Sequence, residues 1–92
     1  MISGQSRPRL AAKARLRFDR QTAQYILLYP ERGLKLNPTA VATVRLCTGE
    51  HTVQEIIERL AEQSSSRIEE IQGQVLAFLG ALANRSLIDV VT

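Results

Sequence analysis

The side chains best suited to catalysis or metal binding are few in this sequence and stand apart from one another. His51 is the single histidine and Cys47 the single cysteine of the chain. A protein zinc site uses about four clustered His, Cys, Asp or Glu ligands, which a lone histidine does not supply. We therefore interpret His51 as a surface-loop residue. Cys47 lies on the apolar side of an expected helix and is interpreted as a buried, unreactive thiol.

No carboxylate pair or phosphate-binding loop can be assembled from the other candidates. Glu69 and Glu70 are adjacent on an expected helix, so their side chains point about 100° apart. They suit the first turn of a helix, where negative charge is favourable. The glycines are isolated and form no phosphate-binding loop motif. The sequence therefore predicts no catalytic residues, no metal and no cofactor, and it favours a binding function over an enzyme.

Length, cysteine count and hydropathy narrow the class of protein. The 92 residues fit one domain with a small core. A single cysteine allows no intrachain disulfide, which is typical of a reducing cytoplasm. No apolar run approaches the roughly 20 residues that span a bilayer, and the N-terminus lacks the apolar segment of a signal peptide. We expect a cytoplasmic protein without membrane contact.

Positive charge is concentrated at the N-terminus. Residues 1–20 hold six basic side chains and one acidic, whereas residues 21–92 hold six basic and eight acidic. Residues 1–12 show no apolar period, so we expect a flexible basic arm there and a single domain at residues 13–92. The arm is either a solvated tail or an electrostatic contact for an acidic partner.

Three short strands are expected after the arm. Residues 14–19 alternate apolar and polar side chains, as a half-buried strand does. Residues 25–29 are apolar on both faces and end at Pro30, which cannot donate to a sheet ladder. Gly33 is expected to provide the turn into a third strand at residues 34–36. Three consecutive short strands predict an antiparallel meander.

Three helices are expected next. Asn37 with Pro38 is typical of an N-cap and a first helical position, and Thr52 with Glu55 forms a capping box for a second helix. A third helix, at about residues 67–84, has apolar positions over an arc of about 160°. Residues 87–91 are expected to close the chain as a short strand or hydrophobic tail. The predicted fold class is α+β: a three-stranded antiparallel sheet, then a three-helix bundle of winged helix-turn-helix type.

The apolar arc of the third helix is wider than one packing layer requires, which is a little over 100°. We therefore expect an extended peptide to pair with the sheet edge at residues 34–36 and to lie along this arc. Small residues on the back of the helix leave a homodimer open. A DNA-binding regulator is the alternative, because the helix order permits it. It is disfavoured because Glu69 and Glu70 would face phosphates, so we expect no nucleic-acid partner.

Three motifs occur in order along nearly the whole chain. The first, Tyr29-Pro30-Glu31-Arg32-Gly33 with Leu36-Asn37, resembles the "PE-x-G…LN" stretch of the PqqD proteins of pyrroloquinoline quinone (PQQ) biosynthesis. Gly49 with residues 52–57 resembles "G-x-x-T-V-x-E-I", and Phe78-Leu79 with Leu82 and Leu87-Ile88 resembles the C-terminal "FL-x-x-L…L-I/V" pattern. Ser86 departs from the family, which commonly has glycine there.

The resemblance implies a winged-helix domain that acts as a peptide chaperone and holds no cofactor. Such a protein binds the ribosomally made precursor peptide PqqA and presents it to PqqE, a radical S-adenosylmethionine enzyme. The resemblance also implies a groove between the third strand and the third helix. Carried over by position, the strand side is Leu34, Lys35 and Leu36, and the helix side is drawn from Ile71, Val75, Phe78 and Leu82.

Overall fold

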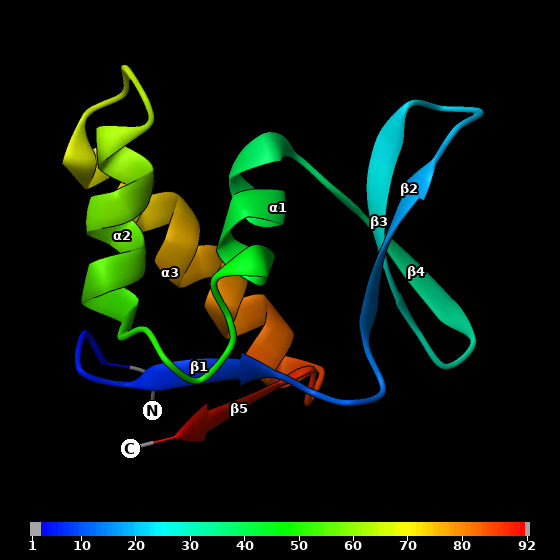
Figure 1. Ribbon diagram of the computed structural model, residues 1–92. Helices are drawn as coiled ribbons and strands as arrows, with labels where there is room; N and C mark the ends of the chain where they lie inside the picture. Colours follow the sequence, from blue (N-terminus) through cyan, green and yellow to red (C-terminus); the bar gives the residue numbers. More distant parts are fainter. Residues whose placement is uncertain (1–2, 92) are drawn as a thin grey trace.

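The computed structural model describes residues 3–91 and contains three helices and two antiparallel sheets (Figure 1). The α+β class and the three helices are as expected. In Figure 1 the helices stand together, with one sheet beside them and the other below. The strands are β1 (Arg7–Leu10), β2 (Arg15–Asp19), β3 (Gln24–Tyr29), β4 (Arg32–Leu36) and β5 (Ile88–Val91), and the helices are α1 (Pro38–Arg45), α2 (Val53–Glu62) and α3 (Ile68–Asn84).

The predicted meander is confirmed as the sheet β2-β3-β4. Leu27 in the central strand lies opposite Leu16 on one side and Leu34 on the other. Paired residues share a sheet face, so all three side chains point toward the helices. Leu27 is fully buried, and its two partners pack against the core that it joins.

The turn between β3 and β4 lies earlier than the sequence predicted. Pro30 and Glu31 form the loop, and Glu31 has a φ of 67°. Proline pre-sets the φ that the first loop position needs, which accounts for the earlier reversal. Gly33 is instead a residue of β4, where an added Cβ would lie 3.1 Å from Cγ2 of Ile26. Its lack of a side chain therefore serves close cross-strand packing.

The expected flexible arm is largely part of the fold. Arg7–Leu10 form β1, which pairs antiparallel with β5, and the Pro8 side chain is fully buried. The single predicted sheet is therefore corrected to two sheets, of two and three strands. The sequence did not indicate β1 because its partner lies at the other end of the chain. Residues 1 and 2 of the predicted arm, and residue 92 of the predicted domain, lie outside the described residues.

The N-terminal segment also completes the start of α2. The first amides of a helix have no partner within the helix. Here the Val53 N–H donates to the Ser6 carbonyl at 2.8 Å, and the Gln54 N–H donates to the Gly4 carbonyl at 3.0 Å. The segment before β1 is thus held in place by these hydrogen bonds to the first amides of α2.

The predicted helix starts are confirmed. Oδ1 of Asn37 accepts from the Ala40 N–H at 2.8 Å at the start of α1. In the capping box of α2, Oγ1 of Thr52 accepts from the Glu55 N–H at 3.1 Å, and Oε1 of Glu55 accepts from the Thr52 N–H at 2.8 Å. These hydrogen bonds lower the pKa of Glu55 below its ordinary value. Local capping residues therefore set both helix starts, as the sequence indicated.

An aliphatic core joins the three helices to both sheets. It is built almost entirely from Leu, Ile, Val and Ala. In the part of the chain that the structure describes, none of the helices has both the length and the apolar character needed to cross a membrane. The core residues are Ala14, Leu27, Leu36, Ala40, Val41, Val44, Cys47, Val53, Ile56, Ile57, Leu60, Ile71, Val75, Leu79, Leu82, Leu87 and Ile88.

Candidate functional site

β4 is an edge strand: among residues 3–91 it pairs with β3 alone. The short loop between the two strands makes Tyr29 and Arg32 a hydrogen-bonded pair, and such pairs alternate along an antiparallel ladder. The backbone N–H and C=O groups of Gly33 and Lys35 therefore point away from β3. This free edge of β4 is the part of the sheet that an extended chain can extend by hydrogen bonding.

The three strand residues predicted for the site divide between the two sheet faces. Lys35 is exposed and lies opposite Ile26 on the face that points away from the helices. Leu34 is half-buried and Leu36 is buried, both on the helix-facing side. A strand added at the free edge would therefore have one side toward Lys35 and the other toward the helices.

Of the four helix residues predicted for the site, three belong to the core. The side chains of Ile71, Val75 and Leu82 are buried in the core, and α3 packs against α1, α2 and β5. A partner cannot reach them without opening that packing. Phe78 is half-buried, so it is the member of the four that remains accessible on the folded domain.

The excess apolar arc of α3 lies on two separate flanks. Leu76 is 38% exposed, and Phe78 is partly covered by the core. Residues two positions apart on a helix are rotated by about 200° around its axis. The two side chains therefore lie on opposite sides of the buried face of α3. One bound segment therefore cannot contact both. On the back of the helix, an added Cβ on Gly73 or Gly80 would meet no atom of the described chain within 4 Å apart from the neighbouring residues and nearby backbone of α3 itself.

Sequence reasoning missed a pocket between α1 and the adjoining end of the sheet. Tyr25 of β3 is one of its lining residues: Nη2 of Arg45 donates to the Tyr25 hydroxyl at 2.9 Å, and the Phe18 ring stands edge-on to the Tyr25 ring at a centroid distance of 5.1 Å. Cζ of Arg45 is also 5.1 Å from the Tyr25 ring centroid. The sequence indicated this pocket only weakly. The helical spacing of the α1 residues places several of them on one face of the helix, but it does not show that this face borders a pocket.

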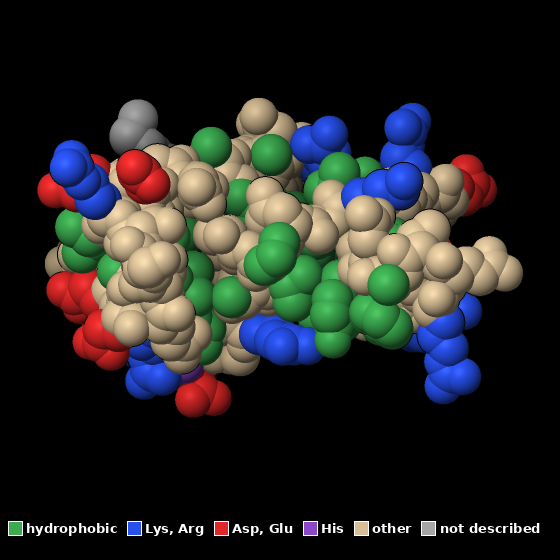
Figure 2. Space-filling view, turned by 90° about the horizontal axis from the view of Figure 1, so that it is seen from above, with side chains coloured by type: hydrophobic (Ala, Val, Ile, Leu, Met, Phe, Trp, Pro, Cys, Tyr) green, Lys and Arg blue, Asp and Glu red, His purple; other side chains and the backbone are tan. Residues whose placement is uncertain are grey.

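This pocket has a volume of about 570 Å³ and a mainly apolar lining. Figure 2 shows hydrophobic side chains across the middle of this side of the molecule, bordered by Lys and Arg side chains. The lining residues are Ala23, Gln24, Tyr25, Leu36, Asn37, Pro38, Val41, Ala42 and Arg45. Because Leu36 belongs to β4, the pocket adjoins the edge strand.

The two reactive residue types occupy sites that do not favour chemistry. Cys47 is buried, and burial raises the pKa of its thiol to about 12. A neutral buried thiol is a poor nucleophile. His51 is half-buried in the loop before α2. Across residues 3–91, no three His, Cys, Asp or Glu side chains are grouped so as to hold a metal ion.

The first turn of α3 carries the two carboxylates that argued against DNA binding. Glu69 and Glu70 are both exposed there. Their charges suit the positive end of the helix dipole. They would repel phosphates if this turn entered a DNA groove, so DNA binding through the start of α3 is disfavoured.

Comparison with known proteins gives one consistent relationship. The family described as "Coenzyme PQQ synthesis protein D (PqqD)" matches residues 24–88. A "PqqA binding protein" of Rhodopseudomonas palustris (strain HaA2) is 38% identical over 87 residues, which cover 95% of this chain and 85% of that protein. This confirms the resemblance seen in the sequence motifs.

Two solved structures share the fold. One is the solution structure of the PqqD truncation of Methylobacterium extorquens PqqCD, described as a functional, stand-alone recognition element for ribosomally synthesised and modified peptides. It is 34% identical, covers 97% of this chain and 95% of its own, and has a TM-score of 0.82. The other is TbiB1 in complex with the TbiA(beta) leader peptide, which is 17% identical, covers 88% and 94%, and has a TM-score of 0.71. The second likeness concerns the fold alone. The match over residues 24–88 and the relatives that span almost the whole chain show that this protein belongs to the PqqD family.

Proposed function

We propose that this chain is a peptide-binding adaptor of PQQ biosynthesis that binds the precursor peptide PqqA along the free edge of β4. The observation that carries the proposal is the outward-pointing backbone of Gly33 and Lys35 at a sheet edge. Each main-chain hydrogen bond to an added strand contributes about 0.5–1.5 kcal/mol net, and pockets for alternate side chains supply specificity. On the helix-facing side, Leu34 and Phe78 are the proposed apolar contacts.

The relatives support the choice of peptide. One is named a PqqA binding protein, and the PqqD structure at 34% identity is described as a recognition element. We further propose that the domain is of winged helix-turn-helix type, acts in the cytoplasm and presents the peptide to the radical S-adenosylmethionine enzyme PqqE. In this role the chain itself holds no cofactor and needs only two accessible surfaces, one for the peptide and one for the enzyme.

Exchanging Lys35 tests the peptide site sharply, because its N–H points away from β3. Lys35→Pro removes that donor without removing a hydrogen bond of the β3–β4 ladder, and proline is tolerated at such edge positions. The matched control Lys35→Ala removes the same side chain and keeps the N–H. By calorimetry, the proline variant is expected to bind PqqA about tenfold more weakly than the alanine variant. Equal affinities would place the peptide elsewhere, and absence of PqqA binding by the parent chain would refute the function.

Amide hydrogen exchange tests the same edge without a substitution. In the free protein the amides of Gly33 and Lys35 should exchange fast, because they face solvent. The Leu34 amide should already be slow, because it belongs to a hydrogen-bonded pair with Leu27. Addition of PqqA is expected to slow the two outward amides and to leave Leu34 unchanged. Unchanged exchange at Gly33 and Lys35 in the bound state would contradict strand addition.

A further inference from the structure

The part of the chain that forms the β2-β3-β4 sheet carries most of the positive charge. Residues 13–36 hold six basic and two acidic side chains, a net charge of +4. The other residues hold six basic and seven acidic side chains, a net charge of −1. All six basic residues between 13 and 36 are exposed. The charge therefore forms a surface feature of this sheet and not of the helices.

The register gathers much of this charge on the outer face, the one that points away from the helices. Arg15 lies opposite Leu28, Arg17 lies opposite Ile26, and Ile26 also lies opposite Lys35. Paired residues share a face, so three cations surround two aliphatic side chains. Ile26 and Leu28 are half-buried. The outer face is therefore an aliphatic strip bordered by positive charge.

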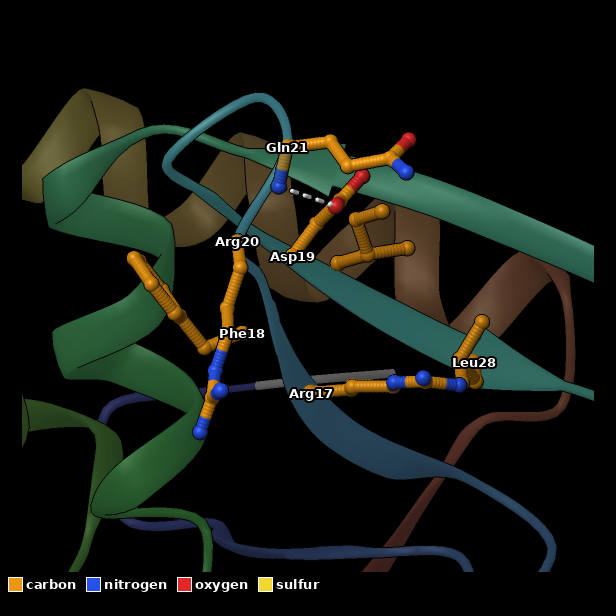
Figure 3. A pocket seen from close by; sticks show the side chains of 7 residues that line it. Arg17, Phe18, Asp19, Arg20, Gln21 and Leu28 are labelled. Carbon is orange, nitrogen blue, oxygen red and sulfur yellow. Dashed lines mark hydrogen bonds between the residues drawn. The ribbon is translucent and has the colours of Figure 1, made fainter.

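Two hollows meet on this face at Leu28. The larger, of about 770 Å³, is lined by Arg17, Arg20 and Ile26 among others. Figure 3 shows Arg17 extended toward Leu28, while Phe18 and Arg20 point to the other side. The carboxylate of Asp19 at its rim accepts the Gln21 N–H at 3.0 Å.

The second hollow, of about 500 Å³, lies between the start of β2 and the loop from β3 to β4. Its lining includes Lys13, Arg15 and Arg32 together with the acidic Glu31, and it shares Leu28 with the first hollow. The aliphatic strip is thus recessed along much of the sheet, with cations on its borders.

We infer that this outer face docks an acidic protein surface that carries aliphatic side chains at its centre. Complementary charge steers association and makes it sensitive to salt, while the recessed strip accepts apolar side chains. A single-stranded nucleic acid is less well matched, because its bases need aromatic platforms. Phe18 and Tyr29 reach the rims of the two hollows, but by register they belong to the helix-facing side of the sheet, where Tyr25 and Tyr29 pack against the core.

The outer face and the free edge of β4 adjoin at Lys35, but a peptide on the edge leaves the part of the outer face around Arg15 and Arg17 open. The inference rests on the proposed function in one respect: the partner used for the test is the enzyme PqqE, to which the peptide would be presented. Lys35 lies where the two surfaces meet and is therefore left unchanged. The test instead reverses two charges on β2.

The variant is Arg15→Glu/Arg17→Glu, and the matched control is Arg59→Glu/Arg67→Glu. All four arginines are exposed, and both double variants change the net charge equally. By titration with PqqE at about 0.1 M salt, the β2 variant is expected to bind at least about tenfold more weakly, and the control within about threefold of the parent. The parent's affinity should fall as salt rises to about 0.3 M, and that of the β2 variant should change little. Affinity for PqqA should be the same in all three proteins.

Several results would overturn the inference. One is absence of PqqE binding by the parent; another is equal loss in the two double variants, which would indicate only net charge. An equal loss of PqqA binding in the β2 variant would make the outer face part of the peptide site. If a short duplex DNA bound the parent and not the β2 variant, nucleic acid would replace the protein partner. Because PqqA binding is measured separately, failure of the peptide function and failure of this inference are distinguishable.

Discussion

The backbone N–H of Gly49 donates to the carbonyl oxygen of Pro8 at 2.9 Å. This hydrogen bond fastens the loop between α1 and α2 to β1. Gly49 has a φ of 85°, in the region that favours glycine. Pro8 is fully buried at the same place. Segments distant in the sequence thus form one packed unit, in which β1 also pairs with β5.

Removal of residues 1–10 should therefore destabilise the domain strongly. The deletion exposes the apolar surface that Pro8 covers and leaves the Val53 and Gln54 amides without their partners. We expect the free energy of unfolding, measured in urea by circular dichroism, to fall by at least about 3 kcal/mol. The exposed control Arg7→Ala should change it by less than about 0.5 kcal/mol. If the truncated chain were as stable as the parent, the sequence-based prediction of a flexible N-terminal arm would be supported instead.

Two leucines of α3 differ in burial, so the same substitution should affect stability very differently at the two positions. Leu82 is 0% exposed and Leu76 is 38% exposed. Leu82→Ala is expected to cost about 2–5 kcal/mol of unfolding free energy, and Leu76→Ala less than about 1 kcal/mol.

The same series tests the helix side of the proposed peptide site. Phe78→Ala should weaken PqqA binding in calorimetry, whereas Leu76→Ala should not, because Leu76 lies on the other flank of α3. If the Leu82→Ala protein kept its stability and lost PqqA binding, Leu82 would be part of the peptide site.

A gain in stability is expected from Ser86→Gly. Ser86 has a φ of 58°, and this conformation costs a residue with a Cβ about 1–2 kcal/mol. Part of that gain is offset by the greater freedom of glycine in the unfolded chain, so a net gain of up to about 1 kcal/mol is expected in calorimetric unfolding. The control Ala83→Gly, inside α3, should instead lose about 1 kcal/mol. A destabilised Ser86→Gly protein would show that the Ser86 side chain itself contributes to the turn.

High pH should weaken the fold through Cys47. Burial raises the pKa of its thiol from 9.0 to about 12, so the unfolded chain releases this proton at lower pH than the folded chain. The stability that the buried thiol retains below about pH 9 is therefore lost as the pH rises toward 12, by at most about 1.4 kcal/mol per pH unit.

Comparison of the parent with Cys47→Val isolates this effect from the titration of other groups. The difference in unfolding free energy between the two proteins should be constant below about pH 9 and should shift against the parent above it. A difference that stayed constant up to about pH 11 would contradict the burial argument. Independently, a thiol reagent at about pH 8 should label Cys47 quickly only in denaturant.

The local elements were predictable from the sequence because their causes act over a few residues. Asn37 caps α1, and Thr52 with Glu55 caps α2, through hydrogen bonds that reach three positions along the chain. The β2-β3-β4 meander followed from alternating side chains and from turns between strands that are neighbours in sequence. Family membership could also be predicted from the sequence, because the motifs occur in order along nearly the whole chain.

The sequence by itself thus determined the helices, the meander, the family and the scarcity of catalytic side chains. Only the tertiary structure decided that β1 pairs with β5, because Arg7 and Val91 meet only when the whole chain has folded. It also decided which part of the apolar arc of α3 is core, since periodicity defines a face and not the neighbour that covers it. Burial of Ile71, Val75 and Leu82, with Phe78 left accessible, depends on where α1, α2 and β5 pack.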